Sequence, residues 1–191
     1  MDAPEGGARA IEPAPLAVRR GCEADAPGLA ALHVRAWQWA YRGLLPDPYL
    51  DGLIQQVAQR ESMWRHILGR GDAGHPVWVA LLGGRLVGFC STAPAQGDLP
   101  DTAELKTIYL EPDAVGSGVG AALIGRALTD LRARGARRAV LWVLDANVRA
   151  RRFYERGGWR ADGATRVEAF QGAPVLEVRY RIDLDGAPPP A

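Results

Sequence analysis

The feature of this sequence that most constrains its fold is a glycine-rich turn between an apolar run and an amphipathic helix. The apolar run Ile108–Leu110 is followed by Pro112 and then by Gly116, Gly118 and Gly120. Beyond the turn, mostly apolar residues recur at the spacing of one helix face, at Gly120, Leu123, Ile124, Ala127, Leu128 and Leu131. The sequence therefore predicts a strand, a tight turn and a helix in immediate succession.

This arrangement is typical of a binding site for an anion. Glycine lets the backbone approach a ligand closely, and the first N–H groups of a helix point towards negative charge, which the helix dipole also favours. We therefore expect a phosphate or pyrophosphate group at Gly116–Ala121. The turn is not a P-loop, because no Gly-Lys-Ser/Thr sequence ends it.

Two other interpretations of the turn remain open. Gly116, Gly118 and Ala121 satisfy the G-x-G-x-x-G/A fingerprint of dinucleotide-binding folds, and Asp145 follows at a suitable distance. Such a fold needs several strand–helix–strand units, whereas only one is clear in this sequence. The turn is also compatible with the start of an ordinary helix that binds no ligand.

A second segment, further along the chain, makes the pattern more specific. The strand predicted at Ala139–Leu144 is followed in order by Asn147, Ala150, Phe153, Tyr154, Glu155 and Gly157. Together with the glycine turn, this segment resembles the GCN5-related N-acetyltransferase (GNAT) family, and the resemblance extends over residues 16–184. One departure is Val115, because members of the family usually place Arg or Gln just before the glycines.

The resemblance implies an α/β fold with a mixed, mostly antiparallel central sheet flanked by helices, in the order βααβββαβαββ. Gly83-Gly84 fits this order as a primed hairpin turn between two apolar runs. One helix is expected directly after the glycine turn. The others are expected at Ala26–Tyr41 (with Asp25 as N-cap), Tyr49–Leu68 and Val148–Arg156. Strands are expected at Leu16–Arg19, Val77–Leu82, Arg85–Ser91, Glu104–Leu110, Ala139–Leu144, Arg166–Phe170 and Val175–Leu184, the last two as a hairpin around Gly172.

Length and composition limit the alternatives. At 191 residues, the chain is expected to form a single N-acetyltransferase domain over residues 16–184, between disordered tails at 1–15 and 185–191. The net charge of +1 argues against nucleic-acid binding. No run approaches the roughly 20 apolar residues of a membrane span and no targeting segment is visible, so we expect a cytoplasmic protein. Cys22 and Cys90 lack metal-site or redox spacing, so both are expected to be buried, with no metal bound.

The resemblance also implies that acetyl-CoA is the co-substrate. The glycine loop would hold the pyrophosphate, the preceding strand would pair with the pantetheine amides, and Asn147 would hydrogen-bond the pantetheine arm. The expected cofactor-binding residues are Ile108, Tyr109, Leu110, Val115, Gly116, Ser117, Gly118, Val119, Gly120, Ala121, Asn147 and Phe153.

Acetyl transfer to an amine requires a neutral amine and a proton for the departing thiolate. By the resemblance, Tyr154 is the general acid, since its phenol is a competent proton donor. Glu104 occupies the place of the general base, acting directly or through water. Plainer interpretations stay open, with Tyr154 as a core aromatic and Glu104 as a solvated charge at a strand end.

The acceptor side is expected between the first helices and the final hairpin. Trp37 and Trp39 flank the buried stripe of the first helix, so one can face the sheet while the other lines a cleft. Ordinary packing of the two rings in the core and at its rim is an equally open interpretation. His33 lies within that stripe and is expected to be a satisfied core histidine. The predicted acceptor is the amine of a small molecule or peptide, and the resemblance allows a homodimer. A CoA-binding module without catalysis, or an acyltransferase for another acyl-CoA, is the alternative.

Overall fold

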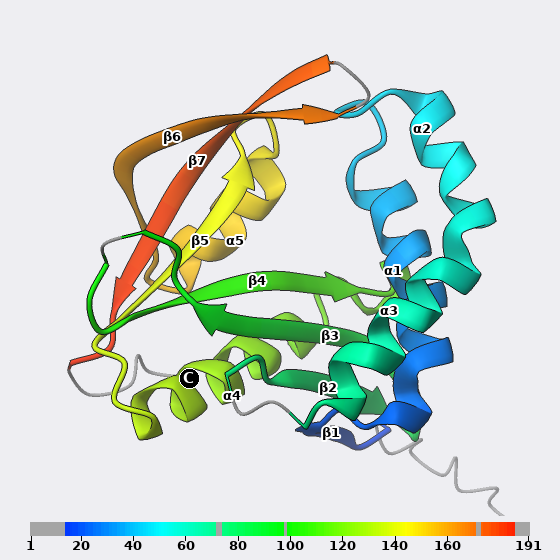
Figure 1. Ribbon diagram of the computed structural model, residues 1–191, viewed down its shortest axis with the longest axis horizontal. Helices are drawn as coiled ribbons and strands as arrows, with labels where there is room; N and C mark the ends of the chain where they lie inside the picture. The colour runs from blue at the N-terminus through cyan, green and yellow to red at the C-terminus, as the bar shows by residue number, and fades with distance from the viewer. Residues whose placement is uncertain (1–13, 72–73, 98, 171–172, 186–191) are drawn as a thin grey trace, which may run out of the picture.

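The computed structural model describes residues 14–71, 74–97, 99–170 and 173–185. Within these ranges the strands form a seven-stranded sheet in the order β1-β2-β3-β4-β5-β7-β6 (Figure 1). Their bounds are β1 Leu16–Arg20, β2 Val77–Leu82, β3 Arg85–Pro94, β4 Thr102–Leu110, β5 Arg138–Leu144, β6 Arg160–Phe170 and β7 Ala173–Asp183. In this sheet β4 and β5 run parallel, and the other neighbouring strands are antiparallel. The predicted mixed, mostly antiparallel sheet is therefore confirmed.

The parallel pair is also the place where the sheet opens. Strands β4 and β5 pair only from Thr102 to Glu104, opposite Arg138 to Val140. Beyond this point β4 stays paired with β3 as far as Leu110, but its other edge is free of β5. Figure 1 shows the two strands pointing apart like the arms of a V. The separation leaves backbone N–H and C=O groups of β4 that need other partners.

Helices cover both faces of the sheet. They are α1 Ala26–Ala40, α2 Asp47–Gly52, α3 Val57–Gly69, α4 Val119–Ala133 and α5 Val148–Arg156, with short 3-10 turns at Glu23–Asp25, Leu53–Gln56 and Pro112–Ala114. Alternate residues of β2 mark the two faces, because Val77 and Val79 pack with α1 and α3, whereas Trp78 and Ala80 pack with α4. In Figure 1, α2 lies near the tip of the β6–β7 hairpin.

The predicted order of elements is present, and α4 buries its apolar stripe from Gly120 to Leu131. The long second helical region is divided, because Gly52 ends α2 and a 3-10 turn precedes α3. Strand β6 begins at Arg160 rather than Arg166. A bulge between Ala161 and Thr165 interrupts the side-chain alternation that marks a strand in sequence. The predicted turn at Gly172 lies outside the described residues.

Two local predictions near the start of α1 are wrong in detail. Asp25 stands at the N-cap position, but its carboxylate accepts from the backbone N–H of Cys22 at 2.8 Å and pairs with Arg19. It makes no capping bond to the helix itself. Cys22 is exposed, whereas Cys90 is buried as predicted. Asp25 is the last residue of the 3-10 turn that precedes α1, and its carboxylate caps the start of that turn at Cys22.

The predicted tails fall mostly on residues 1–13 and 186–191, which lie outside the described residues. The C=O of Pro15 accepts a hydrogen bond from the N–H of Gly83 at 3.1 Å, and Arg137 binds Asp185 at 3.0 Å. Polar contacts with the folded domain thus reach slightly beyond residues 16–184 at both ends. Of the helices in the described ranges, none combines the length and the apolar character needed to cross a bilayer.

Candidate active site

A cavity of about 390 Å³ opens between the diverging strands β4 and β5. Its walls come from β4, the start of α4, the end of β5, α5 and the end of α1. The predicted site residues that line it are Ile108, Tyr109, Leu110, Val115, Gly116, Gly118, Gly120, Ala121, Asn147, Phe153 and Tyr154. The V-shaped gap therefore brings together both sequence motifs, although a strand and a long helix separate them along the chain.

The glycine loop forms one rim of this cavity. Gly116 and Gly118 both have a φ of +86°, a conformation that residues with a side chain rarely adopt. Within the described part of the chain, no acceptor pairs with the backbone N–H groups of Gly116, Gly118, Val119, Gly120 or Ala121. These donors lie at the N-terminus of α4, where the helix dipole adds positive potential. The arrangement is suited to hold a phosphate group.

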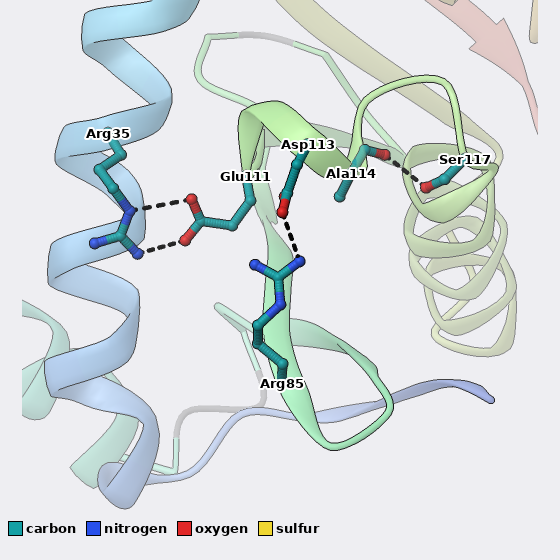
Figure 2. Close-up of polar contacts among 6 residues, drawn as sticks. All are labelled: Arg35, Arg85, Glu111, Asp113, Ala114 and Ser117. Atoms are coloured by element: carbon teal, nitrogen blue, oxygen red, sulfur yellow. Dashed lines mark hydrogen bonds and ion pairs between the residues drawn. The ribbon is translucent and has the colours of Figure 1, made fainter. Parts of the chain in front are cut away.

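Polar contacts hold the turn that leads into this loop (Figure 2). The hydroxyl of Ser117 donates to the C=O of Ala114 at 2.6 Å, while Arg85 binds Asp113 at 2.9 Å. Val119, the first residue of α4, has its side chain buried in the core. Neither Ser117 nor Val119 lines the cavity with its side chain, so only the backbone of these two predicted residues is available to a ligand.

The third glycine of the motif, Gly120, lies where there is no room for a side chain. A Cβ atom at Gly120 would lie 3.1 Å from Cζ of Phe153, closer than most real contacts of this kind. The ring of Phe153 on α5 therefore lies directly against the backbone of the first turn of α4. This contact joins the two helices on one side of the cavity and explains why the motif contains both residues.

The open edge of β4 presents particular backbone groups. The N–H of Glu111 donates to the C=O of Val87 on β3 at 2.8 Å. Backbone groups alternate in direction along a strand, so those of Tyr109 also face β3. The N–H and C=O groups of Ile108 and Leu110 consequently face the gap. Of the three predicted pairing positions, these two present their backbone to the cavity.

Asn147 stands where β5 gives way to α5. Its Oδ1 accepts a hydrogen bond from the N–H of Ala150 at 3.1 Å, as an N-cap should. The residue is buried and lines the cavity, and its Nδ2 has no partner among the described residues. The cap therefore fixes the side chain and leaves one amide donor for a ligand.

Tyr154 lines the same cavity from α5. It is buried and packs edge-on against Trp159, and burial raises the pKa of its phenol well above the usual value of 10. Its hydroxyl makes no hydrogen bond to any described residue. The phenol is therefore protonated near neutral pH and has a proton to donate.

Glu104 lies outside this cavity. It is 5% exposed at the last paired position of β4, and Nζ of Lys106 lies 2.9 Å from its Oε1. The interpretation of Glu104 as a solvated strand-end charge is therefore wrong. It lines a second cavity, of about 150 Å³, and Trp142 borders both cavities. Glu104 and Tyr154 thus face separate cavities that share a wall.

The two tryptophans of α1 divide as predicted. Trp39 is 39% exposed and lines the large cavity, where the guanidinium carbon of Arg149 lies 3.7 Å from the centre of its ring. Trp37 instead packs inwards against Tyr41, with ring centres 5.0 Å apart. The pair Trp39–Arg149 therefore connects α1 with α5 across the gap between β4 and β5.

His33 is buried as predicted, but the prediction that its polar groups are satisfied is wrong. Neither ring nitrogen has a hydrogen-bond partner among the described residues. The ring stacks on Tyr109 with centres 4.9 Å apart. Burial, reinforced by the positive charge of Arg60, lowers the pKa of His33 to about 3. The imidazole is therefore neutral in the folded protein at physiological pH.

The lining of the large cavity includes residues that the sequence did not single out as site residues, among them Trp142 and Glu177. Glu177 lies on β7 opposite Leu144, and its Oε2 accepts from Nε of Arg166 at 2.6 Å. No short motif marks either residue. The register of β7 with β5 brings Glu177 to the cavity, and the available signal for it was its place in the final hairpin, which was expected on the acceptor side. Trp142 lies on β5 itself, where the strand separates from β4.

Residues 33–159 match the family model described as the acetyltransferase (GNAT) family. The chain belongs to this family. It is 30% identical over 181 residues to a probable N-acetyltransferase of Mycobacterium tuberculosis, a match that covers 94% of this chain and 99% of the relative. The predicted family resemblance is therefore confirmed.

Solved structures of this family share the fold. A GCN5-related N-acetyltransferase from Rhodopseudomonas palustris superposes with a TM-score of 0.70 at 22% identity, covering 91% of this chain and 99% of that one. The PaiA N-acetyltransferase of Thermoplasma acidophilum, determined in complex with coenzyme A, gives 0.67 at 18% identity, covering 88% and 99%.

As a GNAT acetyltransferase, the protein uses acetyl-CoA as its co-substrate. The cavity fits this molecule. Unpaired N–H groups at the start of α4 suit a pyrophosphate, and the free backbone groups of Ile108 and Leu110 suit the amides of a pantetheine arm. The described residues offer no group of His, Cys, Asp and Glu that could hold a metal ion.

Proposed function

We propose that this enzyme transfers the acetyl group of acetyl-CoA to a primary amine by direct attack of the amine on the thioester. The observation that carries the proposal is the position of Tyr154, a buried and protonated phenol in the cavity that holds the glycine loop and the open edge of β4. In the reaction the amine nitrogen bonds to the thioester carbonyl carbon and the C–S bond breaks. Tyr154 gives its proton to the departing sulfur, and Glu104 takes a proton from the amine, directly or through water.

Direct transfer is supported by the state of the cysteines. A covalent route needs a thiolate that can accept the acetyl group. Cys90 is buried outside the cavity, its Sγ–H points to the C=O of Leu123 at 3.6 Å, and burial raises the pKa of its thiol to about 12. Cys22 is exposed near the start of α1 and does not line the cavity either.

The first experiment separates cofactor binding from catalysis. Thermal unfolding is measured with and without acetyl-CoA, with NAD and ATP as controls. At 100 times its Kd, a ligand adds about 2.7 kcal/mol of stability, which raises the Tm of a domain of this size by about 5–10 °C. A shift with NAD instead would favour dinucleotide binding. A shift with acetyl-CoA but no thiol release with any amine would leave a CoA-binding module.

Tyr154→Phe then tests the acid. We expect kcat for thiol release to fall by about 100-fold or more, with the Kd for acetyl-CoA unchanged. Tyr180→Phe is the matched control, because Tyr180 is also buried but its hydroxyl donates to Glu155 at 2.7 Å outside the cavity. Equal kcat values for the Tyr154 variant and the unmodified enzyme would remove Tyr154 from the mechanism.

A further inference from the structure

The second cavity lies on the face of the sheet opposite α4. Its lining residues are Ala95, Gln96, Leu99, Glu104, Val140, Trp142, Arg166 and Arg179. Ala139 and Leu141 of β5 pack in the core beneath α4, so Val140 and Trp142, which alternate with them, point to the other face. Trp142 also borders the large cavity, so this small cavity adjoins the proposed site of acetyl transfer.

Charges of both signs are present in this small space. Glu104 is buried, and only its Oε1 is engaged, by Lys106. The guanidinium groups of Arg166 and Arg179 lie over the ring of Trp142, at 4.5 and 5.6 Å from its centre. The cavity therefore contains one carboxylate with a free oxygen and two cations on an aromatic surface.

Both guanidinium groups are held by their inner nitrogen. Nε of Arg166 donates to Glu177 at 2.6 Å and also lies 3.4 Å from Oε1 of Glu168, and Nε of Arg179 donates to Asp162 at 2.8 Å. In the described ranges, no hydrogen bond engages the outer Nη atoms of either arginine. Since a guanidinium has five N–H donors, the acidic partners fix its orientation and leave most of its donors for a ligand.

The strand register places these opposite charges a short distance apart. Glu104 pairs with Val140, and Arg179 pairs with Trp142. Glu104 and Arg179 therefore stand on the same face, on strands separated by β5 and two residues apart along the strand direction, which puts their backbones about 12 Å apart. Both side chains extend into the cavity between them. In the described ranges no ion pair joins Glu104 to Arg166 or Arg179, so the cavity leaves space between these opposite charges for a small molecule that carries both.

We propose that the acceptor is an amine that also carries a carboxylate, of the amino-acid type, and that it binds in this second cavity. Its ammonium group lies against the free oxygen of Glu104, and its carboxylate lies against the outer nitrogens of Arg166 and Arg179. The ammonium first releases one proton to water, and the neutral amine then attacks the thioester carbon from beside Trp142. Glu104 takes the second proton from the nitrogen as the C–N bond forms, while Tyr154 protonates the departing sulfur. This inference rests on the proposed function and names the substrate class for it.

An acceptor without a carboxylate would leave the outer guanidinium nitrogens of these partly exposed arginines to water. A hydrogen bond to a charged group contributes more than one between neutral groups, and the bidentate geometry of a guanidinium matches a carboxylate. The carboxylate therefore adds binding energy and also fixes the amine relative to Glu104. The selectivity is thus expected in kcat/KM rather than in the affinity for acetyl-CoA.

The test compares matched acceptors with the unmodified enzyme. Thiol release is measured for alanine and ethylamine, leucine and isopentylamine, and phenylalanine and phenethylamine, each rate being referred to the neutral amine. We expect the amino acid of at least one pair to be preferred by about tenfold or more in kcat/KM. If the amines without a carboxylate react as well in every pair, this inference is overturned and the proposed function stands. If acetyl-CoA binds and no acceptor releases thiol, the proposed function itself fails.

Variants assign the effect to the cavity. Arg179→Gln is expected to reduce kcat/KM for the preferred amino acid about tenfold and to leave the matched amine unchanged. Arg160→Gln is the control, because Arg160 pairs with Asp183 on the exposed side of β6. A loss of equal size for both acceptors would mean that Arg179 acts only on the fold, and the carboxylate site would be rejected.

Discussion

Arg35 on α1 and Glu111 at the end of β4 form a bidentate ion pair (Figure 2). Nε of Arg35 lies 3.1 Å from Oε2 of Glu111, and the second carboxylate oxygen accepts from an Nη atom. The carboxylate is buried, whereas the guanidinium is half exposed. Since Glu111 directly precedes the turn into the glycine loop, the pair fixes this loop to the helix that carries Trp39 on the other side of the cavity.

Removal of Arg35 is expected to destabilise the protein. Arg35→Met leaves the carboxylate of Glu111 buried without its partner, which costs about 1–3 kcal/mol in the free energy of unfolding. The loss stays below that of a fully buried pair because Arg35 is half exposed. Urea unfolding measures the difference, and Glu111→Gln in the Arg35→Met background should restore part of the loss.

The matched control for this prediction is the neighbouring pair of Arg85 and Asp113, also drawn in Figure 2. Both of its side chains are exposed, so Arg85→Met should cost at most about 0.5 kcal/mol. Equal losses in the two variants would show that burial of Glu111 does not decide the effect.

Substitution in the glycine loop should weaken the binding of acetyl-CoA. Gly118→Ala places a side chain at a φ of +86°, so the loop must shift and its N–H groups lose their alignment. We expect the Kd for acetyl-CoA to rise by about tenfold or more, measured by calorimetry. Gly125→Ala is the control, because Gly125 lies inside α4 with open space around it and should gain about 0.5–1 kcal/mol of stability without a change in Kd.

Features encoded by neighbouring residues could be predicted from the sequence. The stripe of α4 from Gly120 to Leu131 follows from helix periodicity alone, and the hairpin at Gly83-Gly84 follows from its two glycines, both with positive φ. The gathering of the glycine loop, Asn147 and Tyr154 around one cavity came from the family resemblance, because no local rule gives the separation of β4 from β5.

Features that depend on distant residues were not predicted. Glu177 reaches the cavity only through the register of β7 with β5. The bulge near Gly163 hid the first part of β6, because it breaks the alternation that sequence patterns rely on. The sequence marks Glu104 as an exposed strand-end charge, but in the fold it is buried in a cavity that Ala95, Gln96 and Leu99 also line. His33 looks satisfied in sequence, but in the fold its ring packs among aromatic side chains such as Tyr109.

Because His33 is buried, the free energy of unfolding is expected to fall in mild acid. The folded pKa of about 3 lies below the ordinary value of 6.5, so below pH 6.5 the unfolded chain binds a proton that the folded protein does not. The stabilisation is therefore present above pH 6.5 and is lost as the pH falls towards 3. Between pH 7.5 and pH 5 this group alone should remove about 2 kcal/mol.

Urea unfolding of the unmodified protein and of His33→Leu at these two pH values isolates this effect. Leucine keeps a buried apolar side chain next to Tyr109 and cannot titrate. The carboxylates titrate in both proteins, so the difference between the two pH slopes reports His33. Identical slopes would mean that the imidazole is hydrated or paired in solution.

The last prediction concerns Val115, which stands where members of the family usually have Arg or Gln. Val115 lines the cavity beside the glycine loop and is 42% exposed, so a longer side chain at this position can extend over the loop without displacing the core. An arginine there would add charge-assisted hydrogen bonds to the pyrophosphate. Val115→Arg is expected to lower the Kd for acetyl-CoA by about three- to tenfold, with kcat unchanged, because the contact is equal in ground and transition states.

Two comparisons assign this gain to the pyrophosphate. Acetyl-pantetheine lacks that group, so its Kd should be the same for Val115→Arg and for the unmodified enzyme. Val167→Arg introduces the same charge at another exposed valine, on β6 away from the cavity, and should not tighten the binding of acetyl-CoA. Equal gains in the two variants would reflect only the added net charge. A gain for Val115→Arg alone, reduced by salt and absent for acetyl-pantetheine, would mean that the backbone donors of this loop bind the pyrophosphate without side-chain assistance in the natural enzyme.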